Sequence, residues 1–199
     1  MTDSGVIYCP PCDDDSYGIL KIDTITDMVT ILDFNLLPER GGYMWASCAV
    51  ALDGCIYCVP LDARRIMKLD PNNNDTMTSV EDDLGRGEDK CNGTIVGIDE
   101  CVYGILYDSK RILKYDPINY ITSFVGEEDE EDFDCRGDGV LRRDGCIYAL
   151  NNAGRILKID TTNNSHCFSI QLDRDEEYGW SWIDPILGID GCIYLLATI

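Results

Sequence analysis

One sequence pattern recurs along the whole chain, and this repetition constrains the fold more than any other feature. Its clearest copy runs from Asp144 to Asp160 and joins Asp-Gly-Cys-Ile-Tyr to Arg-Ile-Leu-Lys-Ile-Asp. Related copies start near residues 4, 53, 99 and 190, so that consecutive starts lie 49, 46, 45 and 46 residues apart. A period of this length, filled with strand-like segments, is typical of propeller blades.

Each repeat contains four segments with strand character, separated by turn signals. In the repeat that begins near residue 93 the segments are 94–98, 101–105, 111–116 and 120–125. The second segment is apolar on both faces and polarity rises toward the fourth, as expected when the early strands lie near an axis and the last at the rim. The chain begins and ends on a second strand, which predicts seventeen strands. We therefore predict an all-β protein, a β-propeller of about four four-stranded blades forming one domain over residues 1–199, or alternatively an open arc or fragment of a larger propeller.

The repeat also resembles known propeller families. Asp-Gly-Cys-Ile-Tyr followed by Arg-Ile-Leu-Lys-Ile-Asp is similar to the repeat of NHL and YVTN-type propellers, and more loosely to kelch-like blades, whose double glycine appears only at Gly41-Gly42. The Cys after the Gly and the Asp-Pro or Asp-Thr-Thr turn resemble uncharacterised tandem-repeat proteins of unicellular algae. The resemblance implies the fold and says little about chemistry, because propellers include both enzymes and scaffolds.

Acidic residues dominate the charge of the chain. There are 37 acidic and 16 basic residues, giving a net charge of -21, which disfavours binding to nucleic acid or to anionic membranes and favours basic partners. Acidic runs at 81–83, 127–134 and 173–177 follow fourth strands, and the run at 13–15 follows a second strand, so we expect them on one face.

Three interpretations of this acidic face remain open: solvated loops that keep the protein soluble, a docking surface for a basic protein or peptide, and a diffuse Ca²⁺ or Mg²⁺ site. No other cofactor is expected. The candidate binding residues are Glu127, Glu128, Asp129, Glu130, Glu131, Asp132, Asp134, Asp173, Asp175, Glu176 and Glu177.

Two tryptophans mark a second candidate site. Trp45 and Trp182 each lie eight residues before a repeat Asp, and Asp138 and Asp184 each lie six residues before one. The tryptophans are interpreted as packing plugs between blades, or as ligand contacts at the mouth of a central channel. A propeller hydrolase or lyase would have its active site at that mouth.

The cysteines and the single histidine give weaker signals. Eleven cysteines occur, and Cys55, Cys101, Cys146 and Cys192 share one repeat position inside an apolar segment, where Cys acts as a small hydrophobic residue. We expect most thiols to be free and buried. The Cys-x-x-Cys spacings at 9–12 and 55–58 suggest zinc or redox chemistry only weakly, since strand alternation sends the sulfurs at 55 and 58 to opposite faces. His166 has no matched dyad partner, and we interpret it as structural.

Basic residues also recur at fixed repeat positions, Arg65 with its equivalents Arg111 and Arg155, and Lys68 with Lys21, Lys114 and Lys158. Because Lys68 and Asp70 project from the same face of a strand, we expect them to form an ion pair, and their counterparts to do the same.

The sequence favours a non-enzymatic interaction or scaffold propeller with an acidic docking face. The alternatives are a hydrolase or lyase at the channel mouth and a surface that binds divalent cations. No apolar run approaches a membrane span, and the first residues lack the basic and apolar regions of a secretory signal, which predicts an intracellular, cytoplasmic protein.

Overall fold

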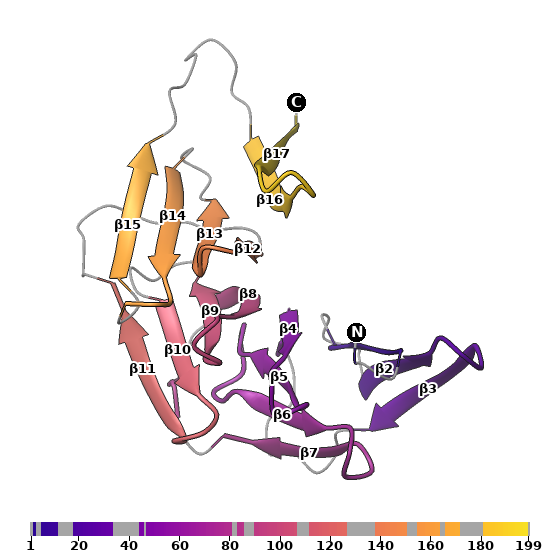
Figure 1. Cartoon of the computed structure of the whole chain (residues 1–199). Coiled ribbons are helices and arrows are strands. Elements are labelled where there is room, and N and C mark those ends of the chain that lie inside the picture. The colour runs from indigo at the N-terminus through magenta and orange to yellow at the C-terminus, as the bar shows by residue number, and fades with distance from the viewer. Residues whose placement is uncertain are drawn as a thin grey trace. The chain divides into compact units, whose positions relative to one another are not determined.

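The described part of the molecule is built from strands alone. In this computed structural model it contains seventeen strands, arranged in sheets of three, four, four, four and two, and no helix (Figure 1). The predicted all-β class and the predicted number of strands are confirmed. The structure describes residues 2, 5–11, 18–33, 44–45, 47–80, 83–85, 90–106, 112–126, 138–150, 155–163, 166–171 and 181–198.

Residues 1–90 form the first of two compact units. It contains one three-stranded and one four-stranded sheet, both antiparallel and both with strands in sequence order. The strands of the first sheet are β1 (Val6–Cys9), β2 (Gly18–Asp23) and β3 (Met28–Asp33), and those of the second are β4 (Ser47–Val50), β5 (Ile56–Val59), β6 (Met67–Asp70) and β7 (Thr76–Ser79).

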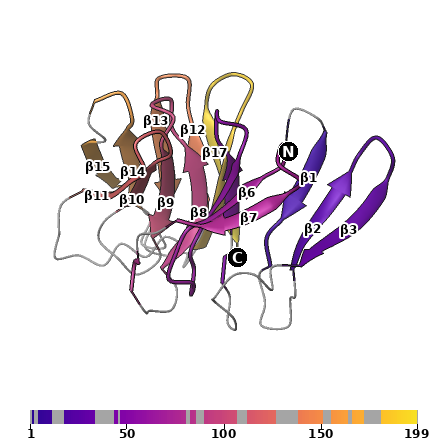
Figure 2. The ribbon, with the colours of Figure 1, turned by 90° about the horizontal axis from the view of Figure 1, so that it is seen from below.

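Residues 91–199 form the second unit, which repeats the same plan. The first strands of its sheets, β8, β12 and β16, lie next to one another, as in radially arranged blades. Figure 2 shows the hairpins of these sheets from a second direction. The strands are β8 (Cys91–Val96), β9 (Val102–Leu106), β10 (Ile112–Asp116) and β11 (Ile121–Val125); β12 (Gly139–Leu141), β13 (Cys146–Leu150), β14 (Arg155–Asp160) and β15 (His166–Gln171); and β16 (Ser181–Leu187) and β17 (Ile193–Thr198).

The order of the strands within a sheet follows the polarity of their residues. Every residue of β5 is buried, whereas β7 alternates between exposed and half-buried positions and five of the six residues of β3 are exposed. A strand covered on both faces needs a continuous apolar run, while a rim strand does not. The polarity gradient read from the sequence therefore matches the observed order. The only register shift within β16–β17 lies between Ile183 and Ile186, where Pro185 lacks the N–H that a regular ladder requires.

The repeat Asp shapes the hairpin between the first and second strand of the last four sheets. In the copy at Asp53 the carboxylate Oδ1 accepts the backbone N–H of Cys55 at 2.9 Å, and Gly54 adopts a φ of +78°. The Asp side chain thus replaces a backbone acceptor, and the glycine supplies the left-handed conformation that the turn requires. Asp99, Asp144 and Asp190 accept the same hydrogen bond from the backbone N–H of the Cys two residues later.

The second carboxylate oxygen of the repeat Asp organises an Asp–Tyr–Lys cluster. Asp53 Oδ2 accepts a hydrogen bond from the Tyr57 hydroxyl at 2.8 Å, and Lys68 Nζ lies 3.3 Å from the same oxygen and 5.4 Å from the centroid of the Tyr57 ring. Tyr57 is fully buried, so the cluster gives its hydroxyl the partner that burial demands. Burial is the largest cause of the raised pKa of Tyr57.

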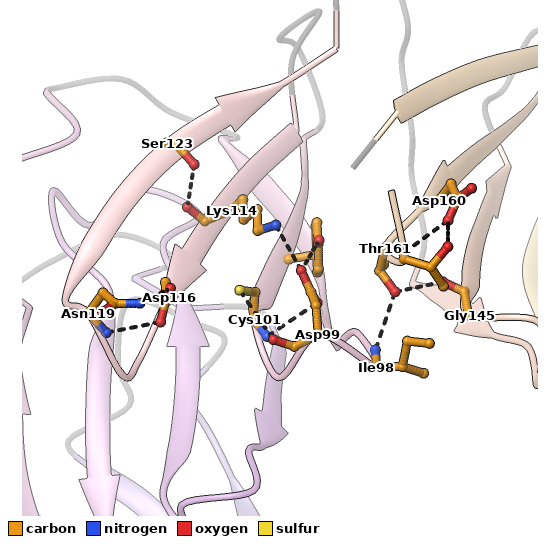
Figure 3. Close-up of polar contacts among 12 residues, drawn as sticks. Ile98, Asp99, Cys101, Lys114, Asp116, Asn119, Ser123, Gly145, Asp160 and Thr161 are labelled. Atoms are coloured by element: carbon orange, nitrogen blue, oxygen red, sulfur yellow. Dashed lines mark hydrogen bonds and ion pairs between the residues drawn. The ribbon is translucent and has the colours of Figure 1, made fainter. Parts of the chain in front are cut away.

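The full cluster repeats in the sheet of Asp99, and the hydroxyls of Tyr148 and Tyr194 also donate to the repeat Asp of their sheets, at 3.3 and 2.7 Å. Figure 3 shows Lys114 directed at Asp99, with Nζ and Oδ2 2.8 Å apart, and the Tyr103 hydroxyl donates to the same carboxylate at 2.8 Å. The expected pair between Lys68 and Asp70 was wrong, because the lysine reaches Asp53 on the neighbouring hairpin and Asp70 instead accepts the N–H of Asn72 at 3.0 Å. Cross-strand proximity thus outweighs proximity along one strand.

In the first sheet the tyrosine and the lysine of the repeat pair with a carboxylate from a neighbouring sheet. Its repeat carries serine where the other copies have the turn Asp, yet the Tyr8 hydroxyl donates to Asp75 Oδ1 at 2.6 Å and Lys21 pairs with Asp75 Oδ2. Asp75 belongs to the turn between β6 and β7, with φ +54°, a conformation that Asp tolerates better than most residues. The loss of one carboxylate is therefore offset by a link between the two sheets of the first unit.

A buried threonine links neighbouring sheets in the second unit. The Thr161 hydroxyl, 3% exposed, donates to the Gly145 carbonyl at 2.6 Å and accepts the N–H of Ile98 at 3.3 Å (Figure 3). Each unit also has its own apolar core. One includes Tyr8, Trp45, Ile56, Cys58 and Met67, and the other includes Tyr103, Ile105, Ile112, Ile147 and Ile159.

The glycines of two successive turns give a matched test of sheet packing. Gly145 and Gly191 both have φ +81°, but a Cβ on Gly145 would lie 2.5 Å from Thr162 Cγ2 and 2.6 Å from Ile98 Cδ1, whereas a Cβ on Gly191 meets nothing within 4 Å. We expect Gly191→Ala to cost about 1–2 kcal/mol from backbone strain alone. Gly145→Ala should cost about 1–3 kcal/mol more from overpacking. Urea denaturation measures both losses, and equal losses would contradict the close packing of Thr162 and Ile98 against Gly145.

The carboxylate of the Asp–Tyr–Lys cluster predicts a pH dependence of stability. Burial alone would raise the pKa of Asp53, but the Cys55 N–H, the Tyr57 hydroxyl and Lys68 together lower it below its usual value. Between the folded pKa and the unfolded value of about 3.9 the unfolded chain binds more protons, so this contribution is present above about pH 4 and is lost as pH falls through the folded pKa.

We therefore expect Asp53→Asn to lower the free energy of unfolding by about 1 kcal/mol at pH 7, a value reduced by the partial exposure of the ion pair. The difference from the parent protein should shrink on acidification and disappear once Asp53 is protonated. Asn keeps the acceptor for the Cys55 N–H, but its NH2 group replaces the oxygen that accepts from Tyr57 and Lys68, so the substitution removes the charge together with that acceptor. A difference that stays constant from pH 7 to pH 3 in urea denaturation would contradict the assignment.

Candidate functional site

A groove lies between two successive hairpin turns of the second unit. It has a volume of about 490 Å³ and is lined by Arg142, Arg143 and Asp144 from the β12–β13 turn and by residues 187–191 from the β16–β17 turn. The repeat positions the groove, because each turn follows the first strand of its sheet and those two strands are neighbours. It is therefore located where adjacent repeats present the same Asp-Gly turn.

Arg142 connects the two turns across this groove. Its Nε donates to the backbone carbonyl of Gly191 at 3.1 Å, and its Nη1 lies 3.0 Å from Asp144 Oδ2. The planar guanidinium holds fixed donors, so these two contacts orient it against both turns. Arg143 is exposed beside it and contributes a second positive charge to the lining.

Two carboxylates balance these guanidinium groups. Burial raises the pKa of Asp144, but the Cys146 N–H and Arg142 together lower it by more. The pKa of Asp144 therefore lies below its usual value. The pKa of Asp190 is lowered chiefly by the Tyr194 hydroxyl, which donates at 2.7 Å, and by the Cys192 N–H. The groove thus presents fixed charges of both signs at neutral pH and suits a polar ligand with donors and a carboxylate or similar anion.

The groove was missed in the sequence reasoning. The available signal was the Arg142-Arg143 pair directly before a repeat Asp in a strongly acidic chain, since no other repeat start has two arginines in these places. We interpreted the repeat turns only as connections between strands. The neighbouring turn that completes the groove is 46 residues further along the chain, so its proximity follows from sheet packing.

The predicted acidic face falls outside the described residues. This applies to residues 127–134 and 173–177, and of the run at 81–83 only Asp83 is described, where it pairs with Arg64 and accepts the N–H of Gly85 at 2.9 Å. The binding role of the acidic residues stays a prediction. The topology does fix where their connections begin, because the runs follow directly after β7, β11 and β15.

The predicted channel-mouth residues occupy different environments. The Trp45 side chain is buried in the first unit, and its Nε1 donates to the Arg65 carbonyl at 3.0 Å. This agrees with the packing interpretation of that tryptophan. In the second unit, exposed Asp138 precedes β12 and its Oδ1 accepts the N–H of Thr94 at 3.3 Å, which links β8 to the next sheet. Trp182 and Asp184 belong to β16, and their side chains are outside the described part.

The cysteines whose side chains are described form no metal cluster. Among the described residues no three His, Cys, Asp or Glu side chains are grouped to hold a metal ion. The eight cysteines whose side chains are described are free thiols, and five of them are buried. Cys12 lies outside the described part, and of His166 only the backbone, in β15, is described. Burial raises the pKa of Cys101 to about 12. A thiol with such a pKa is a weak nucleophile at neutral pH.

Comparison with known proteins identifies the fold alone. Neither a protein-family model nor a curated protein sequence matches the chain. In the described residues no helix is long and apolar enough to cross a membrane. The sequence likeness to algal tandem-repeat proteins finds no support in these comparisons.

Solved structures, in contrast, match almost the full chain. Virginiamycin B lyase from Staphylococcus aureus matches with a TM-score of 0.78 at 12% identity, over 98% of this chain and 61% of the lyase chain. A streptogramin B lyase matches with a TM-score of 0.68 at 15% identity, over 94% of this chain and 63% of its own. The extracellular domain of a one-component system from Bacteroides thetaiotaomicron matches with a TM-score of 0.72 at 13% identity, over 99% and 26%.

The chain therefore spans less than two thirds of the length of these lyase chains. Identities of 9–15% support no shared activity with any of them. The likeness and the repeated antiparallel sheets agree on one point, that this chain has a β-propeller fold.

Proposed function

We propose that this protein is a non-enzymatic interaction module, in which the propeller repeats present an acidic surface to a basic protein or peptide. One observation carries the proposal. The acidic runs at 81–83, 127–134 and 173–177 occupy the same connection in three successive repeats. Each follows the fourth strand of a sheet, β7, β11 or β15, and precedes the first strand of the next sheet. Each repeat thus adds its acidic residues at the same point of the strand order.

The composition of these runs supports a binding role. Residues 127–134 contain seven carboxylates among eight residues and no basic residue. The lysines at the repeat position, by contrast, are engaged within their own sheets. Lys68, Lys114 and Lys158 lie over the hairpin tyrosines, and Lys68 and Lys114 also pair with the turn carboxylates. A concentration of like charge costs stability through self-repulsion, and a basic partner would offset that cost on binding.

A divalent-cation surface is the second candidate, because clustered carboxylates are the oxygen ligands that Ca²⁺ and Mg²⁺ use. The third is a hydrolase or lyase site at a channel mouth, for which the second unit offers Asp138, Trp182 and Asp184. The structurally similar lyases have the fold that this third candidate requires. Their sequence identity to this chain is too low to support a shared activity. We rank it below the other two.

Matched charge variants test the docking proposal. Glu127→Gln with Glu128→Gln removes two charges from the longest acidic run, whereas Asp27→Asn with Glu100→Asn removes two from hairpin turns. Both control positions have positive φ, which Asn tolerates. Binding to a synthetic lysine- and arginine-rich peptide is measured by calorimetry at several salt concentrations.

We expect the acidic-run variant to weaken binding about tenfold at 0.15 M salt, equal to the loss of about 1.4 kcal/mol. The turn variant should change it much less, because exposed charges more than about 8 Å from the peptide are screened at that salt concentration. Equal weakening by both variants would show only a response to net charge and would contradict a docking surface at the acidic run.

The same run allows a separate test of cation binding. If residues 127–134 coordinate Ca²⁺, the melting temperature should rise with Ca²⁺ and saturate, because a ligand that binds only the folded state adds RT ln(1 + [L]/Kd) to stability. Replacing Glu127 to Asp132 by the corresponding amides should remove that rise. An equal effect of Na⁺ at matched ionic strength would indicate screening and rule out a coordination site.

A further inference from the structure

Cys48 and Cys58 are direct partners on neighbouring strands of the first unit. Cys48 lies on β4 and Cys58 on β5, and the register pairs their Cα atoms. Partners in an antiparallel sheet project their side chains from the same face, so the two thiols lie side by side. The Cys-x-x-Cys spacing had drawn attention to Cys55 and Cys58, which strand alternation separates.

The hydrogen-bond pattern places this pair at the spacing that a disulfide needs. Ala51 N donates to the Cys55 carbonyl at 2.9 Å, so the register position of Ala51 and Cys55 is hydrogen-bonded. Alternation along the ladder then makes Cys48 and Cys58 a non-hydrogen-bonded pair, with Cα atoms about 4.5 Å apart. Disulfides occur at Cα separations of about 4.4–6.8 Å, so the bond can form without moving the strands.

The two thiols differ in access to solvent. Cys58 is 1% exposed, whereas Cys48 is half-buried and its thiol donates to the Tyr8 carbonyl at 3.8 Å. Burial raises the pKa of Cys58 well above its usual value, and the adjacent Cys48 adds to this shift. A reagent therefore reaches the pair from the side of Cys48.

The repeat itself does not require sulfur at these two positions. The equivalent partners in the following sheets are Thr94 with Gly104, and Gly139 with Ala149. The pair thus differs from Cys55, Cys101, Cys146 and Cys192, which recur at one position of the repeat. Two cysteines stand opposite each other in only one of these three aligned sheets, where small residues serve the fold elsewhere.

We propose that Cys48 and Cys58 are a cross-strand dithiol that hydrogen peroxide converts into a disulfide within the folded sheet. The Cys48 thiolate attacks one peroxide oxygen, the O–O bond breaks, and the departing hydroxide takes up the proton lost by Cys48. The resulting sulfenic acid is attacked by the Cys58 sulfur. The S–S bond forms as the S–O bond breaks, and the proton of Cys58 leaves with the hydroxyl group as water. Each disulfide therefore consumes one peroxide, which accepts two electrons from the two sulfurs and yields two waters.

The product would join β4 covalently to β5 within the first unit. It would close the chain segment that contains the Asp53 turn, which reduces the conformational freedom of the unfolded state. Because the non-hydrogen-bonded spacing is already present, the native sheet should accept the bond with little strain. The site is separate from the acidic runs, so this inference does not depend on the proposed docking role.

Differential alkylation of the full-length protein tests the proposal. The reduced protein is treated with hydrogen peroxide, free thiols are blocked with one reagent under denaturing conditions, and disulfides are then reduced and labelled with a second. We expect the second label on Cys48 and Cys58 and the first on Cys55, assigned by tandem mass spectrometry. The oxidised protein should unfold at a higher urea concentration than the reduced protein.

Two variants sharpen the test. Cys55→Ala should leave the second label on Cys48 and Cys58, whereas Cys48→Ala should eliminate it from Cys58. First-reagent labelling of both thiols in the peroxide-treated parent protein would overturn the proposal, as would a disulfide from either one to Cys9. The parent protein alone decides between these outcomes, so the proposal remains testable even if Cys48→Ala fails to fold.

Discussion

Each hairpin that carries the repeat Asp depends on the hydrogen bonds that the Asp carboxylate accepts. Its two oxygens act at different levels of structure, since one accepts a backbone N–H within the turn and the other accepts the hydroxyl of a tyrosine on the following strand. That tyrosine is buried in the sheets of Asp53 and Asp99, and a buried hydroxyl without a partner would cost about 1–3 kcal/mol. The lysine of the third strand then compensates the carboxylate charge in these two sheets. One side chain thus couples a turn, two strands and a local charge balance.

The first sheet shows what happens when this carboxylate is missing. Tyr8 and Lys21 keep their places, and Asp75 from the neighbouring sheet supplies the anion. The requirement is therefore for a negative acceptor beside the tyrosine and lysine, and its source in the chain can change. A link within one hairpin becomes a link between two sheets, so a departure from the repeat sequence contributes to packing between repeats.

The sequence predicted the fold well because its information is local and periodic. The apolar second strands, the Asp-Gly turns and the rising polarity each act over a few residues, and the structure confirms the strand number and order. Contacts that depend on how sheets approach were not predicted. Lys68 was assigned to Asp70 on its own strand, but the hairpin brings Asp53 closer, and the groove at Arg142 depends on a turn 46 residues away. Register between strands also determines that Cys58 faces Cys48, whereas sequence spacing pointed to Cys55.

The two kinds of charge in this molecule follow different physical rules. Charges inside the repeat lie next to opposite charges or aromatic rings, and their energy changes little with salt because they are partly shielded from solvent. The acidic runs add charge in the stretches of sequence that follow β7, β11 and β15. Their sequence can therefore vary without disturbing the strands, as expected for connections on a rigid scaffold. A propeller repeat with internally compensated strands can carry a surplus of carboxylates in these connections, and in the function we propose a basic partner binds that surplus.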